Sequence, residues 1–572
     1  MSRKTVIHLF ITLGAVLLYV PFLGSFHLFD WDEINFAEAA REMLISGDWS
    51  RVQIAFEPFW EKPPLFIWLQ ALFMKVFGIN EFAARLPNAI AGIASLNIFY
   101  HIGKKHVGHF FGLFFILAYA GSLAPALYFK TGIIDPVFNL FIFLSIYQWF
   151  LAELELGRQN NARIHYLLSG LFAGLAFLTK GPVALLVAGI VALIRLFSAG
   201  KNAWPGWANI GIAFTTLMLT LGIWLGFETY RHGTWFLTEF LQYQVVLVQG
   251  QIEWHNQPWY YHFLVLFFLC APASVMALPH LFKNPESSTG NASILFSYMR
   301  SLFWTVLIIF SIVTTKIIHY SSLCWIPLAF MAGYSLYAGY TKRMVVSRWL
   351  SLPVFLSLVP LAAFFTIAPY LLTVENRDIL TPLLNKDFFT TRLLLSGNIW
   401  GGWEGIPALI FLCFVLIWIF QFAMGIVRHA IPLFWAVLLF GQYLYIFILP
   451  KAEKQLQGEV ISAIQHETKH EINIVEAWDY KTFAILFYGN AQPNQFKGKW
   501  SETAKKEFPA ESAPNYTARK HWITQNHISN PVRLITRCDY KVDTLFQKKF
   551  RKKTDAGAYY IWEKINPLKP IY

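Results

Sequence analysis

Long apolar runs separated by short polar breaks dominate the chain. Three examples are LFITLGAVLLYVPFLG at 9–24, FGLFFILAYAGSLAPAL at 111–127 and LPVFLSLVPLAAFFTIAPYLL at 352–372. Runs of this length predict helices that cross a membrane, and we count about 13 of them. Their expected centres are residues 16, 92, 118, 142, 172, 190, 218, 269, 308, 330, 361, 415 and 440. The pattern therefore predicts an α-helical polytopic membrane protein.

The pattern changes at about residue 451. The segment KAEKQLQGEVISAIQHETKHEINIVEAWDYKTFAILFYGN predicts a polar helix followed by short strands, and YYIWEKI near the end predicts another strand. The part from 451 to 572 is long enough for a small domain with its own core. We therefore predict a transmembrane domain at 1–450 and a soluble α/β domain at 451–572.

The distribution of charge adds to this prediction an expected orientation of the chain in the membrane. The net charge of +13 is compatible with nucleic-acid binding, but the basic residues lie in alternate polar breaks of a chain that is 56% hydrophobic and 14% charged. This alternation follows the positive-inside rule and places the N-terminus in the cytoplasm. An odd number of spans then puts the C-terminal domain on the outer side. Four cysteines without metal-ligand spacing indicate no disulfide framework.

The first outer loop, expected at 26–80, holds the densest acidic cluster. In WDEINFAEAAREML, apolar residues recur at helical spacing, which predicts an amphipathic helix on the outer face of the membrane. Asp32 at its start has two interpretations, a helix cap or a chemical group. In EKPP, the following proline forces Lys62 into an extended conformation. Lys62 then either contacts a ligand or extends toward lipid headgroups.

Five further polar residues lie next to apolar runs. Asp135 has two interpretations. Its side chain points into a polar cavity, since an isolated carboxylate in a membrane is costly, or it caps a helix before Pro136. Lys180 in TKGP either binds an anion or neutralises a helix C-terminus. Lys316, with His319 and Tyr320, follows a span in TKIIHY. On its own, His319 has a structural interpretation as well as a functional one.

Several motifs occur in a fixed order: DEINFAEAAREM, GDW, WEKPP, NEFAARLP, IIDPVF, FLTKGPVALL, QPWYYHFLVLFFLCAPAS and TKIIHYSSLCWIPLAF. This series resembles the membrane glycosyltransferases of GT-C type that use polyprenyl-phosphate sugars, in the branch of the aminoarabinose transferases, related to the protein mannosyltransferases. The resemblance is dense over 29–92 and thinner to residue 330. It implies a first outer loop whose helices cover a cavity between the spans.

The resemblance also implies roles for single residues. Asp32 falls on the acid at the reaction centre and Asp135 on a second acid of a later span, with Glu33 and Glu61 in support. A separate group is expected at the donor phosphate, and it comprises Lys62, Lys180, Lys316, His319 and Tyr320. No metal ligands and no cofactor are expected, although a divalent cation stays open.

The resulting functional hypothesis is an inverting glycosyltransferase in the bacterial inner membrane. It would move a sugar from an undecaprenyl-phosphate carrier to lipid A, another glycolipid, a glycan or a protein on the periplasmic face, without nucleic acid as a partner. A fixed cation would stabilise the leaving phosphate, and a carboxylate would accept the acceptor's proton.

Two positions depart from the family pattern. Asn35 and Val246 stand where relatives carry arginines expected to serve the donor phosphate. The departures keep two alternatives open. One is a relative with weakened catalysis and a binding role. The other is a polytopic transporter or flippase, although that class needs no acid-rich outer loop with EKPP.

Overall fold

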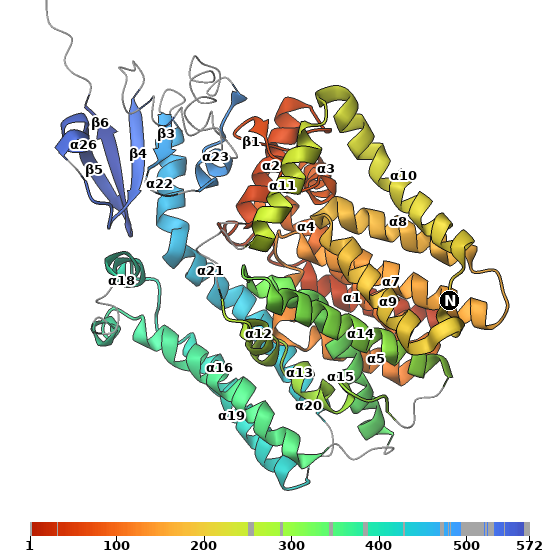
Figure 1. Cartoon of the computed structure of the whole chain (residues 1–572). Coiled ribbons are helices and arrows are strands. Elements are labelled where there is room, and N and C mark those ends of the chain that lie inside the picture. The colour runs from red at the N-terminus through yellow and green to blue at the C-terminus, as the bar shows by residue number, and fades with distance from the viewer. Residues whose placement is uncertain are drawn as a thin grey trace, which may run out of the picture.

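The structure of the chain is a computed structural model in which helices predominate. It describes residues 3–30, 32–249, 257–285, 290–341, 347–380, 387–426, 430–469, 474–478, 482–493, 531–542 and 544–565, together with the single positions 382, 480, 520 and 523. A large helical bundle makes up most of the molecule, and a small four-stranded sheet lies at one end of it (Figure 1).

The bundle consists of helices from nearly the whole first three quarters of the chain. They are α1 (Arg3–Tyr19), α4 (Glu81–His106), α5 (His109–Ala120), α6 (Leu123–Tyr128), α7 (Asp135–Gly157), α8 (Arg163–Lys180), α9 (Val183–Ala199), α10 (Trp207–His232), α12 (Tyr261–Leu269), α13 (Ala273–Ala277), α14 (Gly290–Ile312), α15 (Trp325–Tyr340), α16 (Ser351–Leu371), α19 (Gly405–Ala423) and α20 (Ile431–Tyr443). All the expected span centres fall within these helices. In the described part of the chain, six helices are long and apolar enough to cross a membrane, or seven if the bent pair α12–α13 is one span. The chain is thus an α-helical polytopic membrane protein, while the number of 13 spans stays a prediction.

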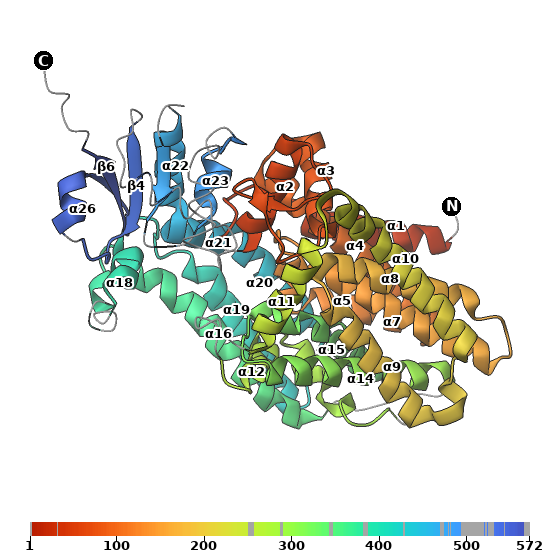
Figure 2. The same ribbon diagram turned by 45° about the horizontal axis from the view of Figure 1, so that its top comes forward.

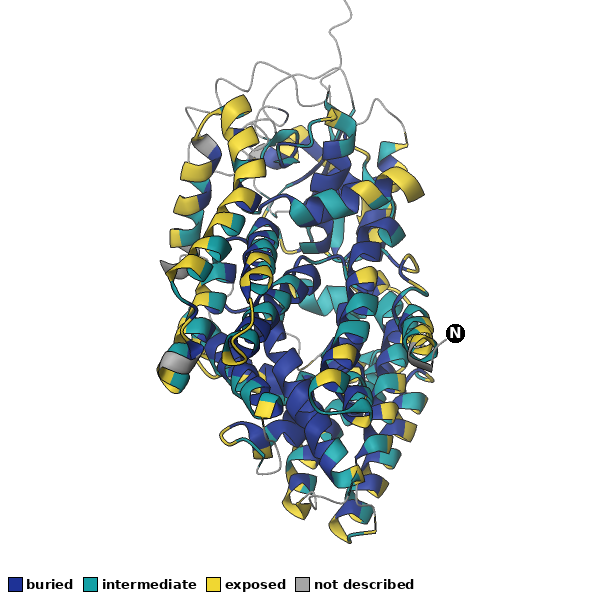
Figure 3. Cartoon of the chain, turned by 90° about the vertical axis from the view of Figure 1, so that its right-hand side faces the viewer, coloured by how far each residue is buried: buried dark blue, intermediate teal, exposed yellow. Residues whose placement is uncertain are grey.

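Small residues allow some of these helices to approach closely. A Cβ atom added to Gly170 of α8 would lie 2.2 Å from the carbonyl oxygen of Ala213 in α10, and one added to Gly174 would lie 2.6 Å from the Thr220 side chain. Glycines four residues apart share one helix face, so the backbones of α8 and α10 come into contact there. Buried residues fill the interior of the bundle, and exposed ones lie along the outer faces of its helices (Figure 3).

The first outer loop contains α2 (Asp32–Ser46), the short strands β1 (Gln53–Ile54) and β2 (Glu57–Pro58), and α3 (Leu65–Phe77). The sequence predicts a helix with one polar face toward water, and for α2 this is wrong. Every residue from Glu33 to Met43 is buried, because α2 packs against α3 on the bundle and against α23 (Ala484–Tyr488) of the C-terminal part. Its polar side chains are therefore interior groups that need partners.

The last span does not end where the apolar sequence ends. Helix α20 continues through η7 (Leu444–Ile448), α21 (Leu449–Glu453) and η8 (Lys454–Gly458) into α22 (Glu459–Thr468), and η7 and η8 are π-helical. One continuous helix thus runs from the bundle into the C-terminal part, and the domain boundary predicted at residue 450 lies inside it.

A mixed sheet follows this helix. Its strands are β3 (Ile474–Ala477), β4 (Val532–Arg537), β5 (Phe550–Ala556) and β6 (Tyr559–Lys564), in the order β3-β4-β6-β5, and only β3 and β4 are parallel. Helices α22 and α26 (Thr544–Lys549) accompany the sheet. The sheet lies at the same end of the bundle as α2 and α3 (Figure 2). The α/β composition expected for this part is present, and its independence as a domain stays a prediction.

Candidate active site

Polar side chains from five separate segments meet below the first outer loop. Asp32 begins α2, and Lys62 lies in the EKPP turn before α3. Asp135 begins α7, and Lys180 ends α8. The fifth segment is η4 (Ile318–Cys324), which carries His319 and Tyr320. Side chains at the ends of helices and in loops can face the space between helices instead of the packed interior.

His319 brings the two predicted catalytic acids together. Its Nε2 atom lies 3.5 Å from Oδ2 of Asp32 and 3.7 Å from Oδ2 of Asp135. An ionised carboxylate only accepts hydrogen bonds. Both acids therefore favour the form of His319 that has a proton on Nε2, because that nitrogen can donate to them. The two carboxylates therefore belong to one site, although 103 residues separate them in the sequence.

The two acids have different surroundings. Asp135 is 2% exposed and forms an ion pair with Lys180, while its Oδ2 atom makes no hydrogen bond. The Asp32 side chain is 32% exposed, and no backbone N–H group of the described residues donates to it. Among the described residues, no capping hydrogen bond holds Asp32, and its partly exposed carboxylate lies near His319.

Lys62 differs from Lys180 in having no carboxylate partner among the residues that the structure describes. Its Nζ atom lies 5.4 Å from the centre of the Tyr243 ring in α11 (Trp235–Gln249). Lys180 lies 4.8 Å from the centre of the Tyr320 ring, but Asp135 already balances its charge. Lys62 is thus the cation at this site whose charge is available to an anionic ligand.

Two tyrosines complete the site. Burial raises the pKa of Tyr243 above its ordinary value, and the carboxylates of Glu61 and Asp32 raise it further. Burial likewise raises the pKa of Tyr320, with additional contributions from the charges of Asp135 and Asp32. Both hydroxyls keep their protons at neutral pH and can donate hydrogen bonds to a phosphate. Tyr243 was not predicted, although it belongs to the YQVVL segment that departs from the family pattern at Val246.

Glu33 is not a reacting group but an anchor. It accepts hydrogen bonds from Nε and Nη2 of Arg85 at 3.0 and 2.9 Å, and from the backbone N–H groups of Phe29 and Gly132. Arg85 also donates to three backbone carbonyls of the segment before α2, those of Leu23, Phe26 and His27. The pair joins α4 to the starts of α2 and of the loop that leads into Asp135.

The remaining acids of α2 are structural as well. Glu38 and Arg41 form a bidentate pair with both distances 2.7 Å. Glu42 accepts hydrogen bonds from the backbone N–H groups of Ala55 and Phe56, which both adopt positive φ angles of 58°. Burial raises the pKa of Glu42, and the neighbouring Glu38 raises it further. Glu33, Glu38 and Glu42 therefore build the loop, and Asp32 is the acid of α2 that is not buried.

A buried lysine links this region to the last span. The Nζ atom of Lys130 lies 3.0 Å from Oε1 of Gln442 in α20 and 4.2 Å from the centre of the Tyr445 ring in η7. Burial lowers the pKa of Lys130 to about 8. No sequence pattern predicts this contact, because the partners of Lys130 are more than 300 residues away.

Three positions named from the sequence remain: Lys316, Asn35 and Val246. Lys316 is buried and donates to the backbone carbonyls of Gln257, at 3.0 Å, and Val313, so its amine braces a loop. Asn35 is buried, and its Oδ1 atom makes no hydrogen bond. The backbone of Val246 lies in α11, but its side chain is outside the described part. Among the described residues, no three His, Cys, Asp or Glu side chains form a metal-binding group.

Comparison with known proteins agrees with this architecture. The fold matches the crystal structure of ArnT from Cupriavidus metallidurans bound to undecaprenyl phosphate, with a TM-score of 0.70, 15% sequence identity and 99% of both chains covered. The apo structure of the same protein matches with a TM-score of 0.69 and 16% identity. Residues 61–225 match the family described as dolichyl-phosphate-mannose-protein mannosyltransferase. The chain thus has the fold of these two structures.

At the level of sequence, the chain is similar to proteins described as aminoarabinose transferases. It is 26% identical over 347 residues to the undecaprenyl phosphate-alpha-4-amino-4-deoxy-L-arabinose arabinosyl transferase of Pseudomonas aeruginosa strain UCBPP-PA14, which covers 59% of this chain and 60% of the relative. The protein of the same description from Shewanella sediminis is 25% identical over 350 residues, covering 58% and 60%. The matched region spans about three fifths of the length of these relatives.

The Glu33–Arg85 pair makes a prediction about stability. Replacing Arg85 by Ala leaves the buried Glu33 carboxylate without its main partner, and breaking a buried pair in this way costs about 3–5 kcal/mol. We expect Arg85→Ala to lower the melting temperature of the purified protein strongly. Arg158→Ala is the matched control, because Arg158 forms an exposed pair with Glu155 and such pairs contribute little. Equal melting temperatures of the two variants would contradict the anchoring role.

Proposed function

We propose that the chain is an inverting glycosyltransferase that moves a sugar from an undecaprenyl-phosphate carrier to an acceptor of the cell envelope. Lipid A is the acceptor favoured by the relatives, and another glycolipid or a protein is the alternative. The arabinosyl transferases among its relatives support the class of donor. The fold shared with a protein crystallised with undecaprenyl phosphate supports it as well.

One observation carries the proposal. The accessible carboxylate of Asp32, the unbalanced cation of Lys62 and the two protonated tyrosines, Tyr243 and Tyr320, belong to the same site. A transporter needs no such combination of an exposed acid with an anion site. Glycosyl transfer from a lipid phosphate needs both, one for each side of the bond that breaks.

The reaction breaks the bond between the anomeric carbon and the phosphate oxygen. The carrier phosphate gains negative charge as this bond lengthens, and the Lys62 amine stabilises that charge in a partly dry site. The hydroxyls of Tyr243 and Tyr320 donate hydrogen bonds to the same phosphate. Asp32 accepts the proton of an acceptor hydroxyl, or orients an acceptor that is already an anionic phosphate. A single displacement inverts the anomeric carbon.

Asp135, Lys180 and His319 serve this reaction indirectly. Lys180 forms an ion pair with the buried Asp135, and His319 lies between Asp135 and Asp32. The Nε2–H group of His319 can donate a hydrogen bond to either acid beside an incoming anionic donor. The family arginine replaced by Asn35 would have added a further cation here. The charge of this site therefore depends more on lysine and histidine than in relatives that keep both arginines.

The orientation in the membrane is part of the proposal. Basic residues in alternate polar breaks support a cytoplasmic N-terminus. The first outer loop and the part from 451 to 572 then lie in the periplasm, where a polyprenyl-linked donor rather than a nucleotide sugar is the available substrate. The chain is proposed to need no cofactor.

The first functional prediction concerns Asp32. Asp32→Asn keeps the size of the side chain and removes no hydrogen bond to the described backbone, so folding should be unchanged. Loss of a general base typically costs 10²- to 10⁴-fold, and we expect transfer to fall by about this factor. Product formation from an undecaprenyl-phosphate sugar by the purified variants, at matched protein concentration, measures the effect.

The matched control for Asp32 is Asp378→Asn in η6 (Arg377–Ile379), which removes an exposed acid. It should leave transfer unchanged. Glu38→Gln is unsuitable because it would break the buried pair with Arg41. Full transfer by the Asp32→Asn protein would remove Asp32 from the mechanism.

The second functional prediction concerns Lys62. Because the phosphate charge grows during the reaction, Lys62→Ala should lower kcat more than it raises the KM for the donor, on the order of 100-fold in rate. Lys75→Ala on α3 is the control, since Lys75 is exposed in the last turn of that helix. Steady-state kinetics at saturating donor separates the two effects. An unchanged kcat would mean that Lys62 only extends toward headgroups.

The third prediction tests the orientation. Cys413 is the exposed cysteine of the chain and the other three are buried, so Cys413→Ser gives a quiet background for labelling. Cysteines introduced at Ser46 and Ser462, both exposed, should react with a membrane-impermeant maleimide in intact spheroplasts. A cysteine at the exposed Asn161 should react only after permeabilisation. The opposite pattern would overturn the periplasmic site.

A further inference from the structure

The segment immediately before α2 has no regular secondary structure, yet it sets the position of Asp32. Residues 27–29 adopt neither helix nor strand, and Asp30 is in a turn. Such a segment has no ladder of backbone hydrogen bonds, so its peptide groups need other partners. Arg85 binds the carbonyls of Phe26 and His27 from the bundle side. The opposite side of the segment is bound by the C-terminal part.

Gln457 makes a two-point contact with this segment. Its Nε2 atom donates to the carbonyl of Leu28 at 2.7 Å, and its Oε1 atom accepts from the N–H of Asp30 at 3.1 Å. One side-chain amide thus satisfies two backbone groups, as a neighbouring strand would. Gln457 lies in the π-helical turn η8, and π-helical turns often mark functional positions.

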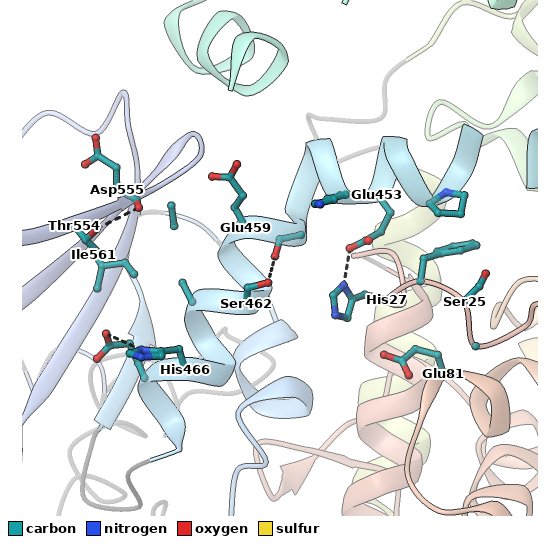
Figure 4. Close-up of a pocket in the computed structure, with 18 of the residues that line it drawn as sticks. Ser25, His27, Glu81, Glu453, Glu459, Ser462, His466, Thr554, Asp555 and Ile561 are labelled. Atoms are coloured by element: carbon teal, nitrogen blue, oxygen red, sulfur yellow. Dashed lines mark hydrogen bonds and ion pairs between the residues drawn. The ribbon is translucent and has the colours of Figure 1, made fainter. Parts of the chain in front are cut away.

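Tyr488 and Glu453 add two more contacts. The Tyr488 hydroxyl accepts a hydrogen bond from the N–H of Leu28 at 2.7 Å and donates to Oε1 of Glu81 at 3.2 Å. The ring of His27 lies 3.0 Å from Oε1 of Glu453 (Figure 4). Both backbone groups of Leu28 are therefore bound by the C-terminal part.

A groove of about 810 Å³ lies beside these contacts. His27, Glu81 and Glu453 contribute to one part of its lining, and α22 and the sheet contribute to the rest (Figure 4). None of the proposed catalytic residues lines it. The contacts thus lie at the junction of the two parts of the chain and not in the reaction site, so any effect on catalysis must act through the segment.

We propose that Gln457, Tyr488 and Glu453 form a clamp by which the C-terminal part positions Asp32. The proposal rests on the proposed function for the role of Asp32, but the clamp itself is a property of the segment. Arg85 fixes the segment from the inside and the clamp fixes it from the outside. These three residues are positioning residues, because Gln457 and Tyr488 bind the backbone before α2, Glu453 binds the side chain of His27, and none of them touches the reacting atoms.

Tyr488→Phe tests the clamp by removing one oxygen atom while keeping the ring. A net backbone hydrogen bond corresponds to roughly a fivefold change in an equilibrium, so kcat should fall about fivefold with the donor KM unchanged. Tyr480→Phe is the matched control, since the Tyr480 hydroxyl has no hydrogen-bond partner in the described structure. Gln457→Ala should lower kcat by about tenfold or more, and Gln465→Ala on the exposed face of α22 should not.

Hydrogen exchange supplies a readout that does not depend on activity. The amides of Leu28 and Asp30 should exchange faster in Tyr488→Phe and Gln457→Ala, respectively, while both controls exchange like the unmodified full-length protein. Melting temperatures should stay close to that of the unmodified protein, because a positioning contact is local.

The outcomes separate the clamp from the proposed function. Unchanged exchange in residues 24–36 of both variants would overturn the clamp. Faster exchange with full kcat, measured with an undecaprenyl-phosphate sugar, would show a held segment that does not position Asp32 and would also overturn the proposal. Absence of transfer by the unmodified protein would instead remove the proposed function, and the exchange data would then decide on the clamp alone.

Discussion

The outer half of the molecule depends on a single buried ion pair, that of Glu33 and Arg85. Taking two charges out of water is costly unless their remaining hydrogen-bonding capacity is used. Here all five N–H groups of the guanidinium donate, and the carboxylate accepts four hydrogen bonds. Because Glu33 follows Asp32 directly and binds the loop before Asp135, this pair fixes both acids of the proposed reaction relative to α4.

The four acids of α2, together with Asp135 of α7, fall into two kinds. Glu33, Glu38 and Glu42 have their oxygens bound to arginines or backbone N–H groups, and they maintain the shape of a buried helix. Among the described residues, Asp32 and the Oδ2 atom of Asp135 accept no such hydrogen bond, and both lie near the imidazole of His319. The proposed reaction thus uses the carboxylates that the described backbone and arginines leave without hydrogen bonds.

The sequence predicted the parts of this structure that depend on local pattern. Apolar runs located the helices, and motif order placed Asp32, Lys62, Asp135, Lys180 and His319 in neighbouring positions. It could not predict burial of both faces of α2, because α23, which covers one face, lies more than 400 residues away. The roles of Arg85 and Gln457 were missed for the same reason, since each binds backbone groups that carry no side-chain signal.

The continuous helix from Ile431 to Thr468 has a mechanical consequence. A flexible linker would let the two parts of the chain turn independently, whereas a helix transmits rotation along its axis. Each residue of an α-helix rotates the chain by about 100° around the helix axis and advances it by about 1.5 Å along the axis. One residue inserted between α20 and η8 would therefore rotate Gln457 away from Leu28 and Asp30. The tilt of the last span in the bilayer is thus coupled to the geometry of the first outer loop. Because hydrophobic mismatch affects the tilt of a span, membrane thickness affects both.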